Sequence, residues 1–349
     1  MKLVIDDKIP FIKGEAEKLG NAIYLPGNKI SAADVRDADV LITRTRTRCD
    51  AQLLKEAAVK FVATATIGFD HIDTAFMEQA GIAWTNCPGC NATSVAQYVE
   101  SSLLVLAQDG LINLNDCTVG IIGVGNVGRR VTERIEVMGC RVLLNDPPRA
   151  EKEADFAVRH SELSTLLNEC DIITIHTPLV TTGNHPTLHL ADERFFALLH
   201  KRPVLINAGR GEVVCTEALL NAIDKAQVRA AIIDTWENEP HINLELLSKV
   251  YIGTPHIAGY SADGKANGTR MSLEAIAHHF GCAANVDVRP PLLPADFCYY
   301  PEGGIPADSR LRLYDPRRDS EALKQTPEKF EALRGNYPLR RETFDPTNS

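Results

Sequence analysis

Short apolar runs rich in β-branched residues alternate along this chain with longer amphipathic stretches, a pattern typical of strands alternating with helices. The runs in the first hundred residues lie at 2–6, 22–26, 39–44, 60–66 and 82–87. After a helix predicted over 94–108, further runs lie at 118–122, 141–146, 171–178, 203–209, 229–236 and 250–256. Because these runs contain few polar positions, we predict parallel sheets covered by helices on both faces.

The two series of runs predict an α/β fold with two doubly wound parallel-sheet domains of the Rossmann or flavodoxin-like type. The chain has 349 residues, more than the roughly 250–300 at which a single core stops growing, and this agrees with two domains. A long helix is predicted over 261–280, and the sequence PPLLP at 290–294 then ends the alternation. We interpret residues 290–349 as a small C-terminal module.

Composition narrows the class of protein. The chain is 44% hydrophobic and 24% charged, with a net charge of −9. A nucleic-acid-binding protein needs a basic face, which this balance does not favour, so no nucleic-acid partner is expected. The apolar runs are too short to span a membrane, and the N-terminus lacks the apolar core of a secretion signal. A soluble, cytoplasmic protein is predicted.

The nine cysteines are scattered among predicted strands and helices, which favours reduced thiols. Cys87 and Cys90 form a CxxC sequence that could be a redox pair or half of a zinc site. No second CxxC or histidine pair completes such a site, so no metal is predicted. We interpret the motif as a structural loop, although a thiol at a helix start can have a lowered pKa.

A glycine-rich turn, GVGNVG at 123–128, joins a predicted strand to a predicted helix. Gly123 permits the turn, Gly125 lets the backbone approach a pyrophosphate, and Gly128 lets the helix pack against the strand. Asn126 and Val127 complete the loop, where backbone amides and the helix dipole would bind phosphate.

An acidic residue follows this loop at the distance expected for a dinucleotide site. Asp146 ends the next strand, 18 residues after the last glycine. A carboxylate there accepts hydrogen bonds from a ribose 2′-hydroxyl and repels a 2′-phosphate, so NAD is favoured over NADP as the cofactor. Arg149 nearby is the feature that favours NADP.

Three side chains in the second half of the chain, Arg210, Glu239 and His256, predict hydride transfer from a hydroxy acid. Histidine suits the role of base for the hydroxyl proton, because its charge changes near neutral pH. Glu239 would bond the other ring nitrogen, and Arg210 would bind the substrate carboxylate with its planar fork. Glycines on both sides of Arg210 suggest that a ligand approaches the backbone closely.

Structural roles for the same residues stay open. Taken singly, His256 could be a structural histidine at a strand end, and Glu239 could belong to a solvated turn. The other histidines, including His71, His176, His185 and His189, lack such neighbours and are left structural or unassigned.

These motifs resemble the D-isomer-specific 2-hydroxyacid dehydrogenases over about residues 1–290. The resemblance is carried by TATIGFDHID at 64–73, CPGCNATSVAQYV at 87–99, GIIGVGNVG at 120–128, NDPPRA at 145–150, HTPL at 176–179, TLHLAD at 187–192, INAGRGEVV at 206–214 and GTPHIAGYSADGKANGT at 253–269. It implies a discontinuous substrate-binding domain of residues 1–95 and 258–289. It also implies an NAD-binding Rossmann domain of residues 96–257 and a homodimer built by a C-terminal dimerisation module of residues 290–349.

PGCNA, DPPRA and HIAGY are closest to one branch of this family. That branch implies oxidation of 4-phospho-D-erythronate to 2-oxo-3-hydroxy-4-phosphobutanoate with NAD, in pyridoxal 5′-phosphate biosynthesis. By the same resemblance, Arg210, Glu239 and His256 are catalytic. Thr45, Thr66 and Tyr260 line the substrate site, and Asp146, Thr177, Asp234 and Gly259 contact NAD.

A phosphorylated substrate needs a second anion site besides Arg210. Arg44, Arg46 and Arg48 alternate just after a predicted strand, and in an extended segment they would share one face. We predict that at least one of them binds the phosphate, with Arg44 and Arg46 placed in the substrate site. A solvated charged edge is the alternative.

Two other functions stay open. The substrate could be another 2-hydroxy acid, such as 3-phosphoglycerate. The same scaffold also serves non-enzymatic, NAD-sensing corepressor proteins, which would have no use for the arginines.

Overall fold

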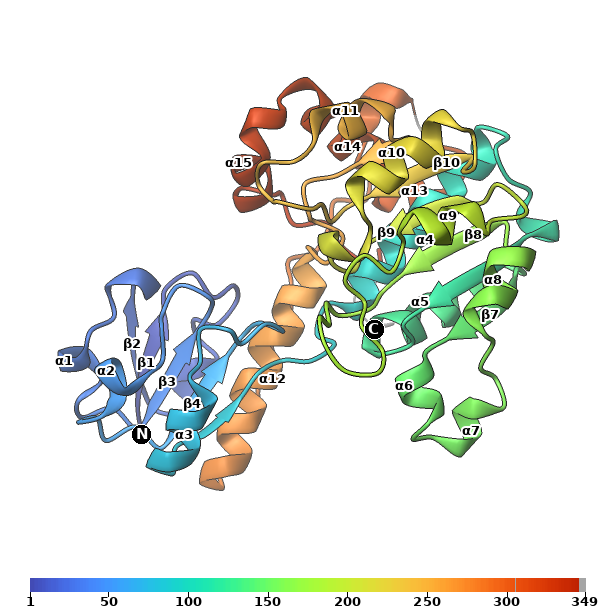
Figure 1. The fold of residues 1–349 in the computed structure, drawn as a ribbon. Helices are drawn as coiled ribbons and strands as arrows, with labels where there is room; N and C mark the ends of the chain where they lie inside the picture. The colour runs from blue at the N-terminus through green and yellow to red at the C-terminus, as the bar shows by residue number, and fades with distance from the viewer. Residues whose placement is uncertain (305, 345–349) are drawn as a thin grey trace. The chain divides into compact units, whose positions relative to one another are not determined.

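The computed structural model describes residues 1–304 and 306–344, and the chain divides into two compact units (Figure 1). Unit 1 comprises Met1–Asn91 and Ser261–Leu292. Unit 2 comprises Ala92–Tyr260 and the chain from Leu293 onward. The C-terminal residues therefore pack with the second unit.

Unit 1 contains a five-stranded parallel sheet in the order β2-β1-β3-β4-β5. Its strands are β1 Lys2–Asp6, β2 Asn21–Leu25, β3 Val40–Thr43, β4 Phe61–Thr64 and β5 Ala83–Thr85. Helix α12, Ala262–Phe280, lies along one face, where Leu273 and Ile276 pack against Leu3 and Ile42 (Figure 1). The other face carries α1 Ala32–Val35, α2 Ala51–Leu54 and α3 Thr74–Ala80.

Unit 2 contains a six-stranded parallel sheet in the order β11-β10-β9-β8-β6-β7. Its strands are β6 Thr118–Ile122, β7 Arg141–Asn145, β8 Ile172–Ile175, β9 Val204–Asn207, β10 Ala230–Ile233 and β11 Ile252–Gly253. The strand order reverses between β6 and β8. In doubly wound sheets, ligands bind at the carboxyl ends of the strands at such a reversal.

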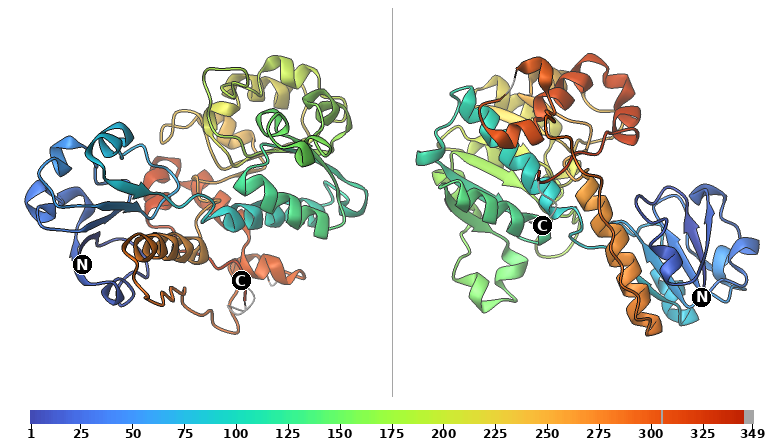
Figure 2. Two further views of the ribbon diagram at one scale, coloured as in Figure 1. Left: turned by 90° about the horizontal axis from the view of Figure 1, so that it is seen from below. Right: turned by 180° about the vertical axis from the view of Figure 1, so that it is seen from behind.

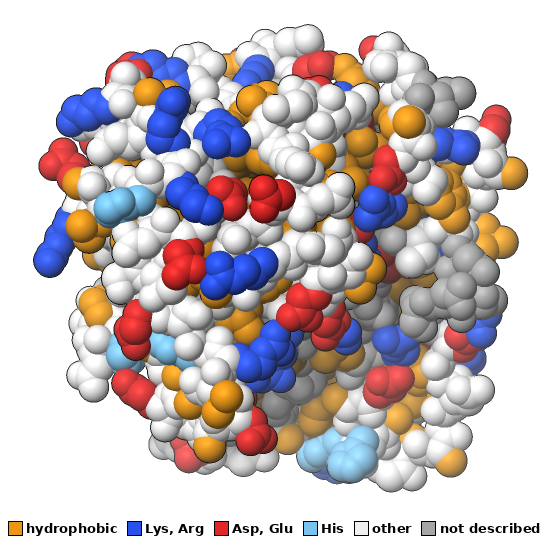
Figure 3. All heavy atoms as spheres, turned by 90° about the vertical axis from the view of Figure 1, so that its right-hand side faces the viewer, with side chains coloured by type: hydrophobic (Ala, Val, Ile, Leu, Met, Phe, Trp, Pro, Cys, Tyr) orange, Lys and Arg blue, Asp and Glu red, His pale blue; other side chains and the backbone are white. Residues whose placement is uncertain are grey.

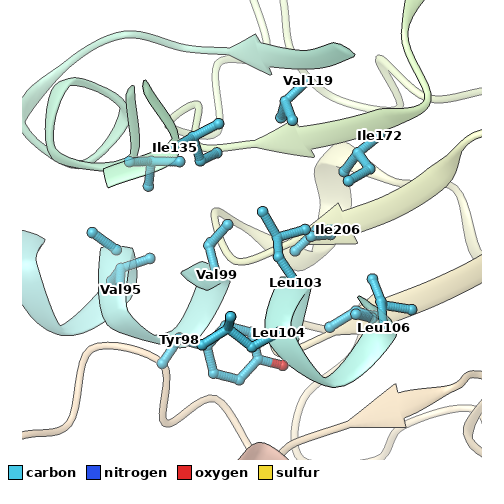
Figure 4. Close-up of a cluster of buried hydrophobic side chains, with 14 of the residues drawn as sticks. Val95, Tyr98, Val99, Leu103, Leu104, Leu106, Val119, Ile135, Ile172 and Ile206 are labelled. Atoms are coloured by element: carbon cyan, nitrogen blue, oxygen red, sulfur yellow. The ribbon is translucent and has the colours of Figure 1, made fainter. Parts of the chain in front are cut away.

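Helices cover both faces of the second sheet. One face carries α4 Ala92–Gln108 and α5 Asn126–Val137, and the other carries α8 Leu163–Glu169, α9 Glu193–Ala197, α10 Thr216–Asp224 and α11 Leu244–Lys249. The short α6 Pro147–Ala150 and α7 Ala154–Ala157 follow β7. Figure 4 shows Val95, Val99 and Leu103 of α4 near Val119, Ile172 and Ile206 of the sheet.

Helix α4 is buried on nearly every side, because the C-terminal segment covers what the sheet leaves exposed. This segment contains α13 Ser309–Leu313, α14 Pro316–Gln325 and α15 Phe330–Gly335. Tyr299, Tyr314 and Tyr337 join the core cluster that α4 forms with the sheet. Figure 2 shows the C-terminal helices as part of unit 2. The C-terminal segment also supplies partners for polar side chains that α4 buries: Ser94 donates to Glu342 at 2.6 Å and Gln97 to the Arg341 carbonyl at 2.8 Å.

None of the helices in the described ranges is long and apolar enough to cross a membrane. In the view of Figure 3, basic and acidic side chains are interspersed over the visible face rather than gathered by sign.

Candidate active site

Arg210, Glu239 and His256 follow the carboxyl ends of three neighbouring strands, β9, β10 and β11. Parallel strands end at the same edge of their sheet, so all three residues belong to loops at one edge of unit 2. The glycine-rich loop after β6 belongs to the same edge.

Side chains join these loops to one another. The Asn207 side-chain amide donates to the carbonyls of Arg210, at 3.1 Å, and Thr235, at 3.3 Å. The indole nitrogen of Trp236 donates to the Thr254 carbonyl at 2.9 Å, and the His256 amide donates to the Asp234 carbonyl at 2.9 Å. The loop positions are therefore fixed by contacts across strands.

His256 and Glu239 form the acid–base pair that the sequence predicts. Nδ1 of His256 lies 2.8 Å from Oε2 of Glu239, whose Oε1 accepts the Trp236 amide at 2.9 Å. Burial alone would raise the pKa of the Glu239 carboxyl. The hydrogen bond and charge of His256, together with the Trp236 amide, outweigh burial and hold that pKa below its ordinary value. Glu239 is thus an anion at neutral pH, and Nε2 of His256 stays available to a substrate.

The backbone after His256 is held by Asp234, which is 1% exposed. Its Oδ1 accepts the Thr254 hydroxyl at 2.6 Å and the Ile257 amide at 2.8 Å, and its Oδ2 accepts the Ala258 amide at 3.0 Å. Burial raises the pKa of Asp234, although the charge of His256 and these three bonds oppose the rise. The side chain serves the loop, so the expected contact of Asp234 with NAD stays a prediction.

Arg210 is exposed, and within residues 1–304 and 306–344 it forms no ion pair with an acidic side chain. Its guanidinium donates to the Gly209 carbonyl at 2.8 Å. The expected reason for the flanking glycines is wrong at Gly211, where an added Cβ would lie 1.9 Å from the Trp236 carbonyl oxygen. Gly211 is required by protein packing, and the arginine itself remains free to bind an anion.

The glycine loop has the shape of a phosphate cradle. Gly123 has a left-handed φ of +85°, and an added Cβ would lie 2.8 Å from Thr177. A Cβ on Gly128 would lie 2.1 Å from the Gly123 carbonyl oxygen, whereas one on Gly125 would meet no atom within 4 Å. Gly123 and Gly128 are therefore packed against protein atoms, whereas Gly125 faces open space at the N-terminus of α5. This arrangement fits a pyrophosphate.

Polar atoms beside this cradle also fit a dinucleotide. The Thr177 hydroxyl is buried and has no hydrogen-bond partner among the described residues. Asp146 receives the Val124 amide at 2.8 Å, which places its carboxylate against the loop. Arg149 donates to the Val124 carbonyl and to Glu153, so its guanidinium is committed to protein contacts and does not favour a 2′-phosphate.

Of the residues predicted to bind substrate, Arg44, Thr45, Arg46 and Thr66 belong to unit 1 and Tyr260 to unit 2. Residues 44–48 form a turn after β3, so the expected extended segment with its three arginines on one face is wrong. A hollow of about 300 Å³ is lined by Arg44 and Arg46 but not by Arg48, which bonds Asp50 at 3.1 Å. The Thr66 hydroxyl donates to the Gly68 carbonyl at 2.9 Å.

Two expectations about other residues need correction. His189 and His185 do have acidic neighbours: their Nε2 atoms lie 2.6 Å from Glu237 and 2.7 Å from Glu151. The Cys87 thiol lies in a buried site 3.1 Å from the Gly268 carbonyl, and burial raises its pKa instead of lowering it. His71 bonds the Thr64 hydroxyl, and burial lowers the pKa of His176 to about 3, so neither suits a base.

Three residues that support this edge were not identified from the sequence. Tyr98 of α4 bonds the Thr254 hydroxyl at 2.9 Å, and Arg334 lies with its guanidinium 6.0 Å from the Tyr260 ring. Arg340 bonds the carbonyls that follow His256. The pair Arg340-Arg341 in the C-terminal segment was the one available signal, and such pairs are too common to carry a prediction.

Comparisons with known proteins agree with this geometry. Residues 97–258 match the family described as D-isomer specific 2-hydroxyacid dehydrogenase, NAD binding domain. The chain is 53% identical over 343 residues to erythronate-4-phosphate dehydrogenase of Bacteroides thetaiotaomicron, covering 98% of this chain and 97% of that protein. It is 44% identical over 358 residues to erythronate-4-phosphate dehydrogenase of Shigella flexneri serotype 5b, covering 98% and 92%.

Among solved structures, the NAD-complexed D-isomer specific 2-hydroxyacid dehydrogenase of Lactobacillus delbrueckii ssp. bulgaricus matches with a TM-score of 0.68 at 22% identity. The match covers 83% of this chain and all of that one, and it supports the fold. This chain is an NAD-dependent dehydrogenase that belongs to the erythronate-4-phosphate dehydrogenases, within the D-isomer-specific 2-hydroxyacid dehydrogenase family.

Proposed function

We propose that this enzyme oxidises 4-phospho-D-erythronate at C2 to 2-oxo-3-hydroxy-4-phosphobutanoate, a step of pyridoxine biosynthesis. The observation that carries the proposal is identity of 44–53% over 98% of the chain to proteins named erythronate-4-phosphate dehydrogenase. The hydrogen-bonded pair of His256 and Glu239, at the same sheet edge as an exposed arginine, supports the chemistry.

The proposed roles follow from which atoms are already occupied. His256 takes the C2 hydroxyl proton at Nε2, because its Nδ1 is bonded to Glu239. The Glu239 carboxylate stabilises the imidazolium that forms, and Arg210 holds the substrate carboxylate through two parallel N–H···O bonds. Bound NAD would supply the acceptor for the hydride that leaves C2. The proton on His256 and this hydride are the two hydrogens that the alcohol loses.

We assign the remaining NAD and substrate contacts from the glycine loop and from the residues that the sequence analysis predicted. The NAD contacts are Gly123, Gly125, Asn126, Val127, Gly128, Asp146, Thr177, Asp234 and Gly259. The substrate contacts, besides Arg210, are Arg44, Thr45, Arg46, Thr66 and Tyr260. Arg44 and Arg46 line the hollow in unit 1 together with Asp6 and Asp7. Arg44 lies 3.6 Å from the Asp6 carboxylate, so Arg46 is the better candidate for an anion contact there.

The assembly and location are also proposals. We propose a homodimer, because the C-terminal segment resembles the dimerisation module of this branch. We also propose that the protein is cytoplasmic. Light scattering of the purified full chain tests the dimer, and a monomeric mass would refute it.

Steady-state kinetics test the reaction. NADH formation is measured with 4-phospho-D-erythronate, D-erythronate and 3-phosphoglycerate at equal concentrations. We expect the highest kcat/KM for 4-phospho-D-erythronate, because only this acid has both the phosphate and the four-carbon chain. A preference for 3-phosphoglycerate, or no NADH with any of the three acids, would overturn the proposal.

A further inference from the structure

The loop that carries His256 is held from two sides. On one side, the Asp234 carboxylate accepts the amides of Ile257 and Ala258. On the other, the Arg340 guanidinium donates to the carbonyls of Ile257 at 3.0 Å and Ala258 at 2.5 Å. It also donates to the Tyr260 carbonyl at 2.9 Å. The Asp234 carboxylate thus accepts from N–H groups of the loop, and the Arg340 guanidinium donates to its C=O groups.

The backbone of His256 depends on such support. Its φ is +56°, in the left-handed region, which is strained for a residue other than glycine. A side chain in that conformation keeps its direction only if the surrounding structure holds the backbone. Arg340 bonds three of the next four residues, Ile257, Ala258 and Tyr260, so it acts on the direction of the imidazole without touching it.

The guanidinium of Arg340 is itself fixed. The residue is 1% exposed, although it comes from the C-terminal segment. Nε donates to the Gln97 side chain at 2.9 Å and Nη2 to the Ser94 carbonyl at 3.2 Å, which anchors the guanidinium to α4. The Tyr314 ring lies 4.0 Å from the guanidinium carbon, so the group is stacked as well as bonded.

A tyrosine connects this cation to a buried acid. The Tyr337 hydroxyl accepts from Arg340 at 3.1 Å and donates to Asp319 at 2.9 Å. Asp319 also accepts the Tyr299 hydroxyl at 2.9 Å. A buried arginine with this number of partners on three segments is a built feature and not a stray surface charge.

We propose that Arg340 is a positioning residue for catalysis, through which the C-terminal segment fixes the loop of the base His256. The proposal rests on the role assigned to His256 under the proposed function. It gives the C-terminal segment a part in turnover that is separate from dimer formation. It also explains why a planar fork is present, since three carbonyls at different angles match a guanidinium better than an ammonium.

The test compares Arg340→Lys with Arg318→Lys in the full chain. Arg318 is the control, because it also lies in the C-terminal segment, donates to the Tyr299 carbonyl and stacks on a tyrosine ring, but it is exposed and does not touch the His256 loop. We expect Arg340→Lys to lower kcat about 10- to 100-fold, because a displacement of ~1 Å at a reacting group can cost about 10²-fold. The affinity for NADH, measured by fluorescence, should fall much less than kcat, because Gly259 lies in this loop but the glycine loop and Asp146 lie outside it. Arg318→Lys should leave both values unchanged.

Hydrogen exchange of the peptide around residues 254–261 provides a second measurement. We expect faster exchange there in Arg340→Lys, with exchange in β6 and α5 unchanged. Tyr337→Phe, which keeps the ring and removes the hydroxyl link, should show a smaller change in the same direction. Unchanged kcat with unchanged exchange would overturn the proposal, and so would a loss of kcat accompanied by faster exchange throughout the chain. If the wild type oxidises no 2-hydroxy acid, the proposed function fails, while the exchange comparison still decides whether Arg340 holds the loop.

Discussion

Replacing Glu239 by glutamine is the sharpest test of the proposed chemistry. The change removes one negative charge and keeps the size of the side chain. Oε2 of Glu239 lies 2.8 Å from Nδ1 of His256, so the lost charge is the one nearest to the imidazolium that forms when the hydroxyl proton is taken. The carbonyl oxygen of glutamine can still accept the Trp236 amide, which keeps the loop intact. Its NH2 group then faces Nδ1 of His256 and favours the tautomer protonated at Nε2, which adds to the loss of activity.

The size of the effect follows from the geometry. Two unit charges about 4 Å apart, the separation of the charge centres in such a pair, attract by ~1 kcal/mol in water and ~4 kcal/mol near a protein surface. The two side chains are 28% and 18% exposed, so the site lies between these limits. Since each ~1.4 kcal/mol corresponds to a factor of ten in rate, kcat should fall roughly 5- to 1000-fold.

The assay is NADH formation at saturating substrate, with Glu237→Gln as the control. Glu237 is two positions away and bonds His189 at 2.6 Å, so the control removes the same charge from a neighbouring histidine pair. Glu237→Gln should keep kcat within about threefold of the wild type, because His189 has no assigned part in the reaction. If Glu239→Gln keeps kcat within twofold, or if both variants lose the same activity, the pairing of His256 and Glu239 is not what drives proton transfer.

Three further predictions concern the cofactor cradle and the C-terminal segment. Gly125→Ala should fold normally, since its Cβ meets no atom within 4 Å. It should weaken NADH binding about tenfold or more, because the added methyl group occupies the space of the pyrophosphate. Unchanged affinity in a fluorescence titration would contradict the assignment. Burial raises the pKa of Asp319 from 3.8 to about 6. The folded chain therefore retains a proton that the unfolded chain releases in this window, and the contribution of Asp319 to stability falls as pH rises from about 4 to 6, by up to about 3 kcal/mol. Asp319→Asn should remove this slope from urea unfolding measured at pH 4 to 7, and a slope equal to that of the wild type would count against it. Ser320→Ala leaves the buried Gly253 amide without its 3.0 Å acceptor and should lower the free energy of unfolding by about 1–3 kcal/mol, whereas Ser248→Ala, at an exposed hydroxyl, should change it by less than about 0.5 kcal/mol.

Local spacing was enough to predict the glycine loop, whereas the catalytic set of Arg210, Glu239 and His256 was predicted from residue chemistry together with the family resemblance. Gly123, Gly125 and Gly128 have roles set by the backbone within six residues, and Asp146 lies at the end of the adjacent strand β7. Parallel strands bring the loops that carry Arg210, Glu239 and His256 to one edge.

Contacts between distant segments could not be predicted in this way. Arg340 bonds residues more than 80 positions away, and nothing in the local pattern of the C-terminal segment identifies it as buried. The alternation of Arg44, Arg46 and Arg48 gave a wrong expectation for a related reason. The segment turns after β3, with Thr47 buried and its hydroxyl donating to the Gly27 carbonyl at 2.8 Å, a contact that period-two alternation cannot reveal.

The position of β11 explains why the base needs the C-terminal segment. β11 is two residues long and lies at the edge of its sheet, paired with β10 on one side. A short edge strand is a weak support for a catalytic loop, because half of its backbone groups lack a partner in the sheet. Here α14 supplies partners on the open side: Ser320 accepts the Gly253 amide at 3.0 Å, and Lys324 donates to the Val250 carbonyl at 2.6 Å. The C-terminal segment thus covers the sheet edge that precedes His256 and also binds the carbonyls that follow His256. Fold stability and the direction of the imidazole therefore depend on the same segment.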